Sequence, residues 1–185
     1  MNLHLGCGSR YLPGYVHVDL CKAPHVDYQR DIRNLSMFRD ETVHLIYASH
    51  VIEYFDREEV IEVLKEWRRV LLPKGLLRLS VPDFSVLVDV YSENRNLNQV
   101  IGPIFGRWKP DNTDLLLHHK MVYDCATLDQ VLVEAGFCES VAWDWRTVFI
   151  EDLSEYDDYS KAYIPHLNFE SGRKISLNRE AIKAG

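Results

Sequence analysis

The sequence has no excess of positive charge and no long apolar run, and each shortage excludes a class of protein. Its 185 residues contain 21 Lys and Arg against 28 Asp and Glu, a net charge of -7. Nucleic-acid-binding domains usually carry a basic face, so this balance disfavours a nucleic-acid partner. No apolar run approaches the ~20 residues that a membrane-spanning helix needs, and no charged segment precedes an apolar one as in a signal peptide. We therefore expect a cytoplasmic protein with no membrane partner.

Cysteine is also scarce, and its spacing follows no known pattern. The chain has four cysteines, and none forms a C-x-x-C pair or a zinc-like spacing, so we expect no metal site. Unpatterned thiols without a secretion signal are typical of a reducing cytosol. Cys7 lies between two glycines, and we interpret it as a small space-filling side chain. A nucleophilic thiol is the alternative, but no base lies nearby in the sequence.

The length and the alternation of elements predict one α/β domain covering residues 1–185. Short β-type runs alternate with helical ones over the first two-thirds of the chain, which favours a parallel sheet. Expected strands cover residues 2–5, 15–19, 25–29, 43–49 and 76–81, with late strands over 137–145 and 147–150. Expected helices cover about 57–72, 84–91 and 127–135. Asp56 and Glu59 form the capping-box pattern at the start of the first helix.

Two long stretches, 92–120 and 151–172, break this alternation. Loops of this length inside compact domains are uncommon and often functional. The alternative is a solvated excursion on the surface.

A glycine turn, Gly6-Cys7-Gly8, directly follows the first expected strand. Glycine lets the backbone approach a ligand closely because it has no Cβ, and ligands of open α/β sheets bind at the carboxyl ends of strands. The turn does not complete a dinucleotide fingerprint. Tyr11 stands at the third glycine position, and Asp19 follows Gly6 by 13 residues instead of ~20. A nicotinamide dehydrogenase is therefore disfavoured. Residues 9–14 are long enough only for a bare loop back to the second strand.

The stretch LHLGCGSRYLPGYVHVDL at residues 3–20 resembles the opening of class I S-adenosylmethionine-dependent methyltransferases, and especially a group of short bacterial ones of type 11. The resemblance continues through residues 31–34, IYASHVIEYF and VLKEWRRVLLPKGLLRLSVPDF, and resumes at HHKMVYD, LVEAGF and ISLNREAIK. It therefore covers most of the chain. It implies a Rossmann-like, seven-stranded, mostly parallel sheet with helices on both faces and the last strand antiparallel.

The resemblance also implies S-adenosyl-L-methionine as cofactor and S-adenosyl-L-homocysteine as product. Asp19 would accept bonds from both ribose hydroxyls, as one carboxylate can; the alternative is a turn carboxylate at the end of a strand. In either reading we expect Asp19 to lie outside the core, so that its loss leaves the fold intact.

Asp31 and Ile32 would face the adenine, with a capping role for Asp31 as the alternative. Arg10 is a candidate partner of the methionine carboxylate, or a surface arginine. The implied cofactor-binding residues are Gly6, Cys7, Gly8, Arg10, Asp19, Leu20, Asp31, Ile32, Ala48, Ser49 and His50.

Four residues are candidates for catalysis on the acceptor side. His50 would sit where the methyl group is presented, as a base or as a pocket wall. Asp83 is an acceptor contact or a helix N-cap. His118 and His119 are neighbours and therefore point apart, which argues against a metal site shared by them. One of them is a candidate base, or both pack beside residues 115–117. We expect the stretches 92–120 and 151–172 to build this side.

The chain departs from the family pattern at two places. Val43-His44 stands where Phe-Asp is usual, and Glu53-Tyr54 stands where Glu-His is usual. The family's helix before the first strand also has no counterpart here. Two functional hypotheses stay open: methyl transfer to a small molecule, such as a sugar or another metabolite, and an S-adenosylmethionine-binding interaction module without turnover. The sequence leaves the acceptor open.

Overall fold

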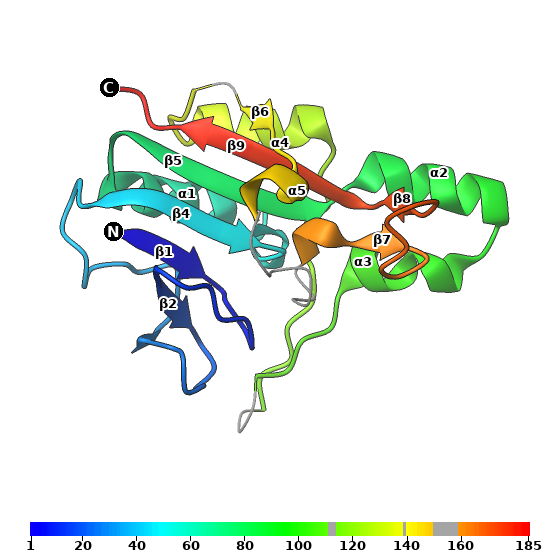
Figure 1. The fold of residues 1–185 in the computed structure, drawn as a ribbon, viewed down its shortest axis with the longest axis horizontal. Helices are drawn as coiled ribbons and strands as arrows, with labels where there is room; N and C mark the ends of the chain where they lie inside the picture. The colour runs from blue at the N-terminus through cyan, green and yellow to red at the C-terminus, as the bar shows by residue number, and fades with distance from the viewer. Residues whose placement is uncertain (111–113, 139, 150–158) are drawn as a thin grey trace.

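A computed structural model of the chain describes residues 1–110, 114–138, 140–149 and 159–185. Its centre is a seven-stranded sheet in the order β3-β2-β1-β4-β5-β9-β6 (Figure 1). The strands are β1 (Asn2–Leu5), β2 (Tyr15–Asp19), β3 (Tyr28–Gln29), β4 (Val43–Ser49), β5 (Leu71–Pro82), β6 (Val141–Ala142) and β9 (Ser176–Ile182). β1 to β5 pair in parallel, whereas β9 is antiparallel to β5 and β6. The expected Rossmann-like sheet with an antiparallel last strand is confirmed.

Three of the five early strands have the predicted bounds, and two differ. β1, β2 and β4 match, because each is a short run of β-type residues bounded by turn residues. The third strand shrinks to β3 (Tyr28–Gln29). The fifth begins at Leu71, directly after a helix, and includes Pro82, which pairs with Ser176. Pro82 is the last residue of β5, where the ladder no longer needs its missing N–H.

The late strands are where the sequence prediction is wrong. Among the described residues of the expected 137–145 strand, Val141–Ala142 form a strand that pairs with β9, and Phe137 makes an isolated bridge with Lys183. Residues 147 and 148 belong to the helix α5 (Trp145–Val148), because Asp144 caps it by accepting the N–H of Arg146 at 2.9 Å; residue 150 lies outside the described residues. The strand that pairs with β5 on the side away from β4 is β9. Buried side chains of β9 mostly alternate with less buried ones.

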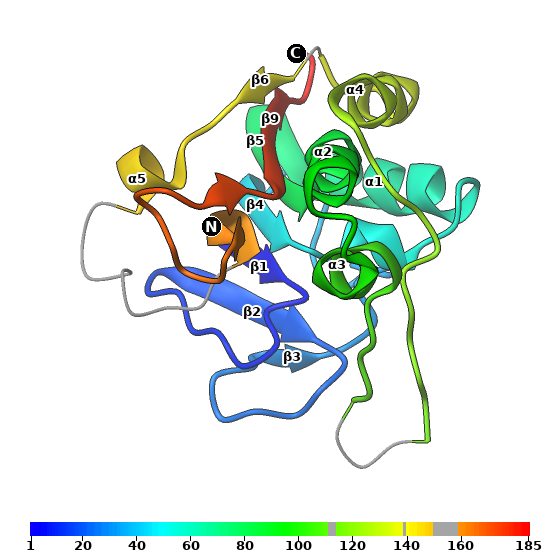
Figure 2. The ribbon, with the colours of Figure 1, turned by 90° about the vertical axis from the view of Figure 1, so that its right-hand side faces the viewer.

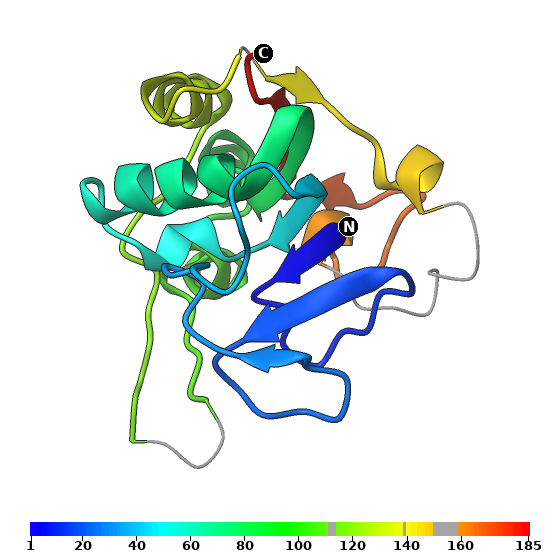
Figure 3. The same ribbon diagram turned by 90° about the vertical axis from the view of Figure 1, so that its left-hand side faces the viewer.

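Two helices, α1 (Glu59–Val70) and α4 (Cys125–Glu134), cover the same face of the sheet (Figures 2 and 3). The start of α1 forms the expected capping box. Asp56 Oδ1 accepts the N–H groups of Glu58 and Glu59 at 3.0 and 2.9 Å, and the Glu59 carboxylate returns to the Asp56 N–H at 3.4 Å. The main core lies between these helices and the sheet, and its buried members from α1 are Val60, Ile61, Val63, Leu64, Trp67 and Val70.

The opposite face of the sheet is covered mainly by aromatic side chains. Tyr47 of β4 packs edge-on to Trp143 and Phe149, with ring centroids 6.1 and 5.5 Å apart. Trp143 Nε1 donates to the Leu79 carbonyl at 2.9 Å, which fixes the aromatic layer to β5. Residues 6–14, all of them described, form turns and loop rather than a crossover helix, as their length predicted. Buried Leu12 from this loop joins the aromatic cluster.

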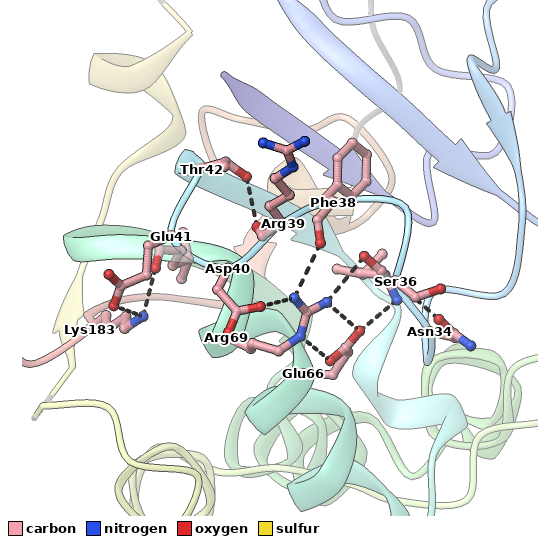
Figure 4. A network of polar contacts seen from close by, with 12 residues as sticks. Asn34, Ser36, Phe38, Arg39, Asp40, Glu41, Thr42, Glu66, Arg69 and Lys183 are labelled. Carbon is pink, nitrogen blue, oxygen red and sulfur yellow. Dashed lines mark hydrogen bonds and ion pairs between the residues drawn. The ribbon is translucent and has the colours of Figure 1, made fainter.

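The segment that joins β3 to β4 is held against α1 by a polar network (Figure 4). Arg69 donates to Glu66 and Asp40, and to the carbonyls of Phe38 and Leu35. Glu66 in turn accepts the Leu35 N–H at 2.8 Å. These bonds fix the path of the chain that leads out of β3.

The two long stretches contain several short elements beyond the carboxyl ends of β1 and β4 (Figure 1). α2 follows β5 and extends into the first stretch. The elements are α2 (Phe84–Asn94), η2 (Leu97–Gln99), α3 (Ile101–Phe105), η4 (Tyr159–Lys161), β7 (Tyr163–Ile164) and β8 (Arg173–Lys174). Residues 111–113 and 150–158, with part of the expected acceptor side, lie outside the described residues. Nowhere in the described ranges does a helix reach the length and apolar character that crossing a membrane requires.

Candidate functional site

The glycine turn after β1 combines a tightly packed glycine with an open one. Gly6 has φ 63° and Gly8 has φ 54°, values that favour glycine. A Cβ on Gly6 would lie 2.5 Å from Val51 Cγ2, so the turn is pressed against the segment after β4. A Cβ on Gly8 would meet nothing within 4 Å. Gly8 therefore presents bare backbone to open space at the carboxyl end of β1.

Asp19, the last residue of β2, is bound to this turn. Its Oδ2 accepts the Gly8 N–H at 2.8 Å and its Oδ1 accepts the Cys21 N–H at 2.7 Å. The side chain is buried, with 2% of the residue exposed. The expectation that Asp19 lies outside the core is therefore wrong, because the turn folds over it. Each carboxylate oxygen has two acceptor positions and one is used on each, so an acceptor position remains on each oxygen for the hydroxyls of a ribose diol.

Cys7 is buried beneath the turn and is 0% exposed. Burial, followed by the nearby Asp19 carboxylate, raises the pKa of the Cys7 thiol to about 12. His25 Nε2 lies 3.8 Å from the sulfur, but a thiol of that pKa forms little thiolate at neutral pH. The space-filling interpretation of Cys7 is the one that the structure supports. Leu20, after Asp19, is 36% exposed.

Asp31 and Ile32 follow β3, and both are hydrogen-bonded to other side chains. Asp31 accepts the backbone N–H of Arg33 at 2.9 Å and its guanidinium at 2.9 and 2.5 Å. Burial opposes ionisation of Asp31, but the Arg33 bonds outweigh it and lower its pKa. Ile32 is 8% exposed, and its carbonyl accepts Trp67 Nε1 from α1 at 2.8 Å. Asp31 thus closes a local turn with Arg33 instead of capping a helix, since residues 31–42 form only turns and loop. An adenine amino group would share its carboxylate with Arg33.

The end of β4 presents His50 in a left-handed conformation, after buried Ala48 and Ser49. His50 has φ 53°, and its N–H donates to the Ser80 carbonyl at 2.8 Å. Its ring stacks on Tyr159, with centroids 5.0 Å apart. The Arg10 guanidinium lies 4.2 Å from the centroid of the same Tyr159 ring. Tyr159 therefore contacts both Arg10 and His50, two residues predicted to bind the cofactor that are 40 positions apart in the sequence.

Glu53 lies between two of the residues predicted for catalysis, and its place in the sequence indicated only a departure from the family pattern. Its Oε1 lies 3.6 Å from His50 Nδ1 and 3.9 Å from His119 Nε2. It is 0% exposed, and within the described residues neither carboxylate oxygen has a hydrogen-bond partner. Burial raises its pKa to about 8. The available signal in the sequence was a carboxylate that follows the fourth strand and lies three residues after His50. Its burial could not be predicted from the sequence.

The two neighbouring histidines have different surroundings. The His119 side chain is 7% exposed, its Nδ1 lies 2.9 Å from the Pro103 carbonyl oxygen, and its ring meets Tyr54 edge-on at 4.7 Å. Burial lowers the pKa of His119 despite bonds to backbone carbonyls. His118 is exposed, with Nδ1 3.0 Å from the Gly106 carbonyl. The structure thus brings His119, and not His118, to His50.

Asp83 was predicted to be either an acceptor contact or a helix N-cap, and it forms the N-cap. Its Oδ1 accepts the N–H groups of Ser85 and Val86 at 3.1 and 3.4 Å, and so caps α2. In the part of the chain that the structure describes, no group of three His, Cys, Asp or Glu side chains could hold a metal ion.

Comparisons with known proteins point to one family. Residues 3–79 match the family described as "Methyltransferase domain". No curated protein sequence matches the chain. A solved S-adenosylmethionine-dependent methyltransferase from Methanosarcina mazei is similar, with 16% identity and a TM-score of 0.57 over 99% of this chain and 92% of that one. A putative methyltransferase from Listeria monocytogenes has 15% identity and a TM-score of 0.53 over 100% of this chain and 91% of that one.

A third similar structure contains ligands. It is the 1,6-didemethyltoxoflavin-N1-methyltransferase of Burkholderia thailandensis with bound 1,6-didemethyltoxoflavin and S-adenosylhomocysteine. It shares 12% identity and a TM-score of 0.56, over 100% of this chain and 71% of that one. At these identities the likeness shows the fold, and the family match covers β1 to β5, which carry the glycine turn and Asp19.

Proposed function

We propose that the chain is a class I S-adenosylmethionine-dependent methyltransferase that methylates a small-molecule acceptor, a proposal supported by the family match over residues 3–79 and by the shared fold. When bound, the cofactor supplies a methyl group already activated on a sulfonium sulfur. The chain's own residues then have three tasks: to hold the cofactor, to hold the acceptor in line with the methyl group, and to accept a proton if the acceptor carries one.

The observation that carries the cofactor assignment is the bond between Gly8 and Asp19. It joins open backbone at the end of β1 to a carboxylate at the end of β2. In open α/β sheets, ligands bind outside the carboxyl ends of the strands. In this proposal Gly6 and Gly8 face the methionine and ribose part, and the free acceptor positions of Asp19 take the two ribose hydroxyls.

The adenine would lie against the segment after β3. Ile32 supplies an apolar surface whose position is fixed by Trp67, and Asp31 supplies an acceptor for the adenine amino group. Arg10, placed over Tyr159, is within the part of the site that would hold the methionine carboxylate. Arginine is suited to this role because its guanidinium binds carboxylates bidentately.

The acceptor side is proposed to lie beyond β4, among His50, Tyr54, His119 and Tyr159. Its aromatic rings and imidazoles come from the end of β4 and from both long stretches. A small molecule suits this side, and the similar Burkholderia structure holds one together with S-adenosylhomocysteine. Holding two reactants in line contributes up to ~7–11 kcal/mol to catalysis. A base adds typically ~10²–10⁴-fold where the nucleophile carries a proton.

Binding and turnover can be tested separately. Calorimetry with S-adenosylhomocysteine, and with NAD as the control, tests the cofactor assignment; we expect heat only with the former. Incubation of the protein with S-adenosylmethionine and pools of small metabolites, followed by mass spectrometry of S-adenosylhomocysteine, tests turnover. Product that needs both protein and an acceptor supports a methyltransferase. Tight binding without product from any pool would favour the interaction module instead.

A further inference from the structure

Glu53 is a buried carboxyl group surrounded by side chains that can exchange protons. It lies in η1 (Ile52–Tyr54), directly after β4. Its Oε1 lies 3.6 Å from His50 Nδ1 and 3.9 Å from His119 Nε2, and so faces both rings. The phenols of Tyr54 and Tyr123 are also close enough to interact with it, and burial is the largest cause that raises the pKa of both. The described groups that face Glu53 are therefore two imidazoles and two phenols.

The backbone fixes this arrangement from two sides. The Glu53 carbonyl accepts the N–H groups of Lys120 and Met121 at 2.8 and 3.2 Å. The end of the first long stretch is thereby tied to η1, which holds His119 beside the carboxyl group. A Cβ on Gly106 would overlap the His119 ring, so the backbone at Gly106 also packs directly against this ring.

The hydrogen bonds of His119 determine which of its nitrogens can carry a proton. Nδ1 lies 2.9 Å from the Pro103 carbonyl oxygen, and a carbonyl only accepts, so Nδ1 carries a proton. Nε2 then faces Glu53 Oε1 either as a lone pair or, in the imidazolium, as a second N–H. A lone pair facing an ionised carboxylate would be repelled. The pair Glu53–His119 therefore holds at least one proton between its two facing atoms.

His50 connects this pair to the open part of the site. Its Nδ1 faces the same Oε1 at 3.6 Å, while its Nε2 lies 3.3 Å from Ser176 Oγ. Its ring lies against Tyr159, where we place the reacting groups. The distances to Glu53 exceed a hydrogen bond, and such contacts commonly tighten only when substrate is bound.

We propose that Glu53 is a neutral carboxylic acid that shares its proton with His119 and links it to His50, so that the three groups form an internal proton relay. Glu53 is then a positioning residue that acts through the two histidines. Burial supports the neutral form, because it raises the pKa of Glu53 to about 8 and lowers that of His119.

The relay deepens the proposed function and rests on it, because it defines the class of acceptor. It suits a nucleophile that carries a proton, a hydroxyl or an N–H group. In the reaction a bond forms between the acceptor O or N and the methyl carbon, and the carbon–sulfur bond breaks with its electron pair going to sulfur. The acceptor proton passes to His50 Nε2. The His50 Nδ1 proton moves to Glu53 Oε1, and the Glu53 proton moves to His119 Nε2. The positive charge ends on His119, next to the Pro103 carbonyl.

The protonation states can be measured without knowing the acceptor. Nitrogen-15 NMR of the imidazoles reports the tautomer and titration of each histidine, and infrared spectroscopy reports protonated carboxyl groups. In the wild-type protein we expect His119 to carry a proton on Nδ1 alone at pH 7. We also expect the carbonyl band of a protonated carboxyl group, with a step near pH 8 where Glu53 loses its proton.

Glu53→Gln should abolish the infrared band and the step near pH 8. Glu62→Gln is the matched control, because Glu62 is 74% exposed and pairs only with Lys65 among the contacts of the described residues; it should keep both signals. If Glu53→Gln does not fold, the wild-type band and His119 tautomer still decide the question. A His119 protonated on both nitrogens, without a carboxylic acid band, would mean an ion pair and overturn the relay.

Calorimetry on the same samples separates the relay from the proposed function. Binding of S-adenosylhomocysteine by a protein whose Glu53 is ionised at pH 7 would overturn the relay and leave the methyltransferase assignment intact. A protonated Glu53 in a protein that binds no S-adenosylhomocysteine would contradict the proposed function instead. It would also remove the role of the relay in methyl transfer.

Discussion

The amide of Gly8 donates a 2.8 Å hydrogen bond to the carboxylate of Asp19, so that the turn after β1 and the end of β2 form one unit. Asp19 is at once a structural acceptor for two backbone amides and the proposed ribose ligand. Any substitution of Asp19 therefore changes the shape of the glycine turn as well as the ligand's partner.

We expect Asp19→Asn to weaken both the fold and cofactor binding. An asparagine amide offers one accepting oxygen, so the N–H of Gly8 or Cys21 loses its acceptor, at a cost of ~1–3 kcal/mol. For a domain of this length the melting temperature should fall by roughly 2–4 °C per kcal/mol. Affinity for S-adenosylhomocysteine should fall roughly ten- to a hundredfold, since hydrogen bonds to charged groups contribute ~1.5–3 kcal/mol.

Asp89→Asn is the control for this variant, because Asp89 is exposed on α2. Calorimetry and thermal unfolding on both variants check the prediction. Wild-type affinity in a folded Asp19→Asn protein would remove Asp19 from the site.

Trp67→Phe tests whether α1 holds the adenine side in place. The variant keeps an aromatic ring in the core but leaves the buried Ile32 carbonyl without its 2.8 Å donor. We expect a loss of about 1–3 kcal/mol in the free energy of unfolding and weaker binding of S-adenosylhomocysteine. Urea denaturation and calorimetry measure the two effects. Trp108→Phe, which changes a half-buried ring outside the core, should leave both nearly unchanged.

The buried carboxyl of Glu53 predicts a specific dependence of stability on pH. Its pKa rises from 4.5 to about 8 on folding, so between these values the native state holds a proton that the unfolded state releases. Stability from this group is therefore full below pH 4.5 and falls as pH rises towards 8. Glu53→Gln removes that dependence.

The measurement is the free energy of unfolding in urea, from pH 5 to pH 9, for the wild type and Glu53→Gln. His119, whose lowered pKa acts in the opposite direction, is present in both proteins. We expect the variant to gain on the wild type as pH rises. A difference that is constant over this range would show that Glu53 titrates normally in the folded protein.

Gly106→Ala should displace His119 without touching Glu53. Gly106 has φ 51°, and an added Cβ would overlap the imidazole. We expect a lower melting temperature and altered NMR signals of His119. Gly102→Ala is a matched control in the neighbouring helix, since a Cβ there meets nothing within 4 Å. It should be neutral or stabilising by ~0.4–1 kcal/mol. Unchanged His119 signals in Gly106→Ala would contradict the packing described.

Local patterns in the chain were enough to predict three strands whose ends carry proposed cofactor-binding residues. β1, β2 and β4 are short β-type runs, and the glycine turn and Asp19 stand at their ends. The carboxyl ends of parallel strands lie at one edge of a sheet, so spacing along the chain predicted which residues meet there. The helix α1 and its cap followed in the same way from periodicity and from the pair Asp56–Glu59.

The contacts around Glu53 and Tyr159 could not be predicted in this way, because they join distant segments. Nothing near Glu53 in the chain indicates that it is fully buried, and Tyr159 meets Arg10 and His50 only through the return of the last segment. The same holds for β9: its run of Asn, Arg and Glu lacks a strong strand signal, and pairing with β5 makes it a strand. Burial and pairing across the sheet depend on which segments the fold brings together, and that information is absent from any local stretch of sequence.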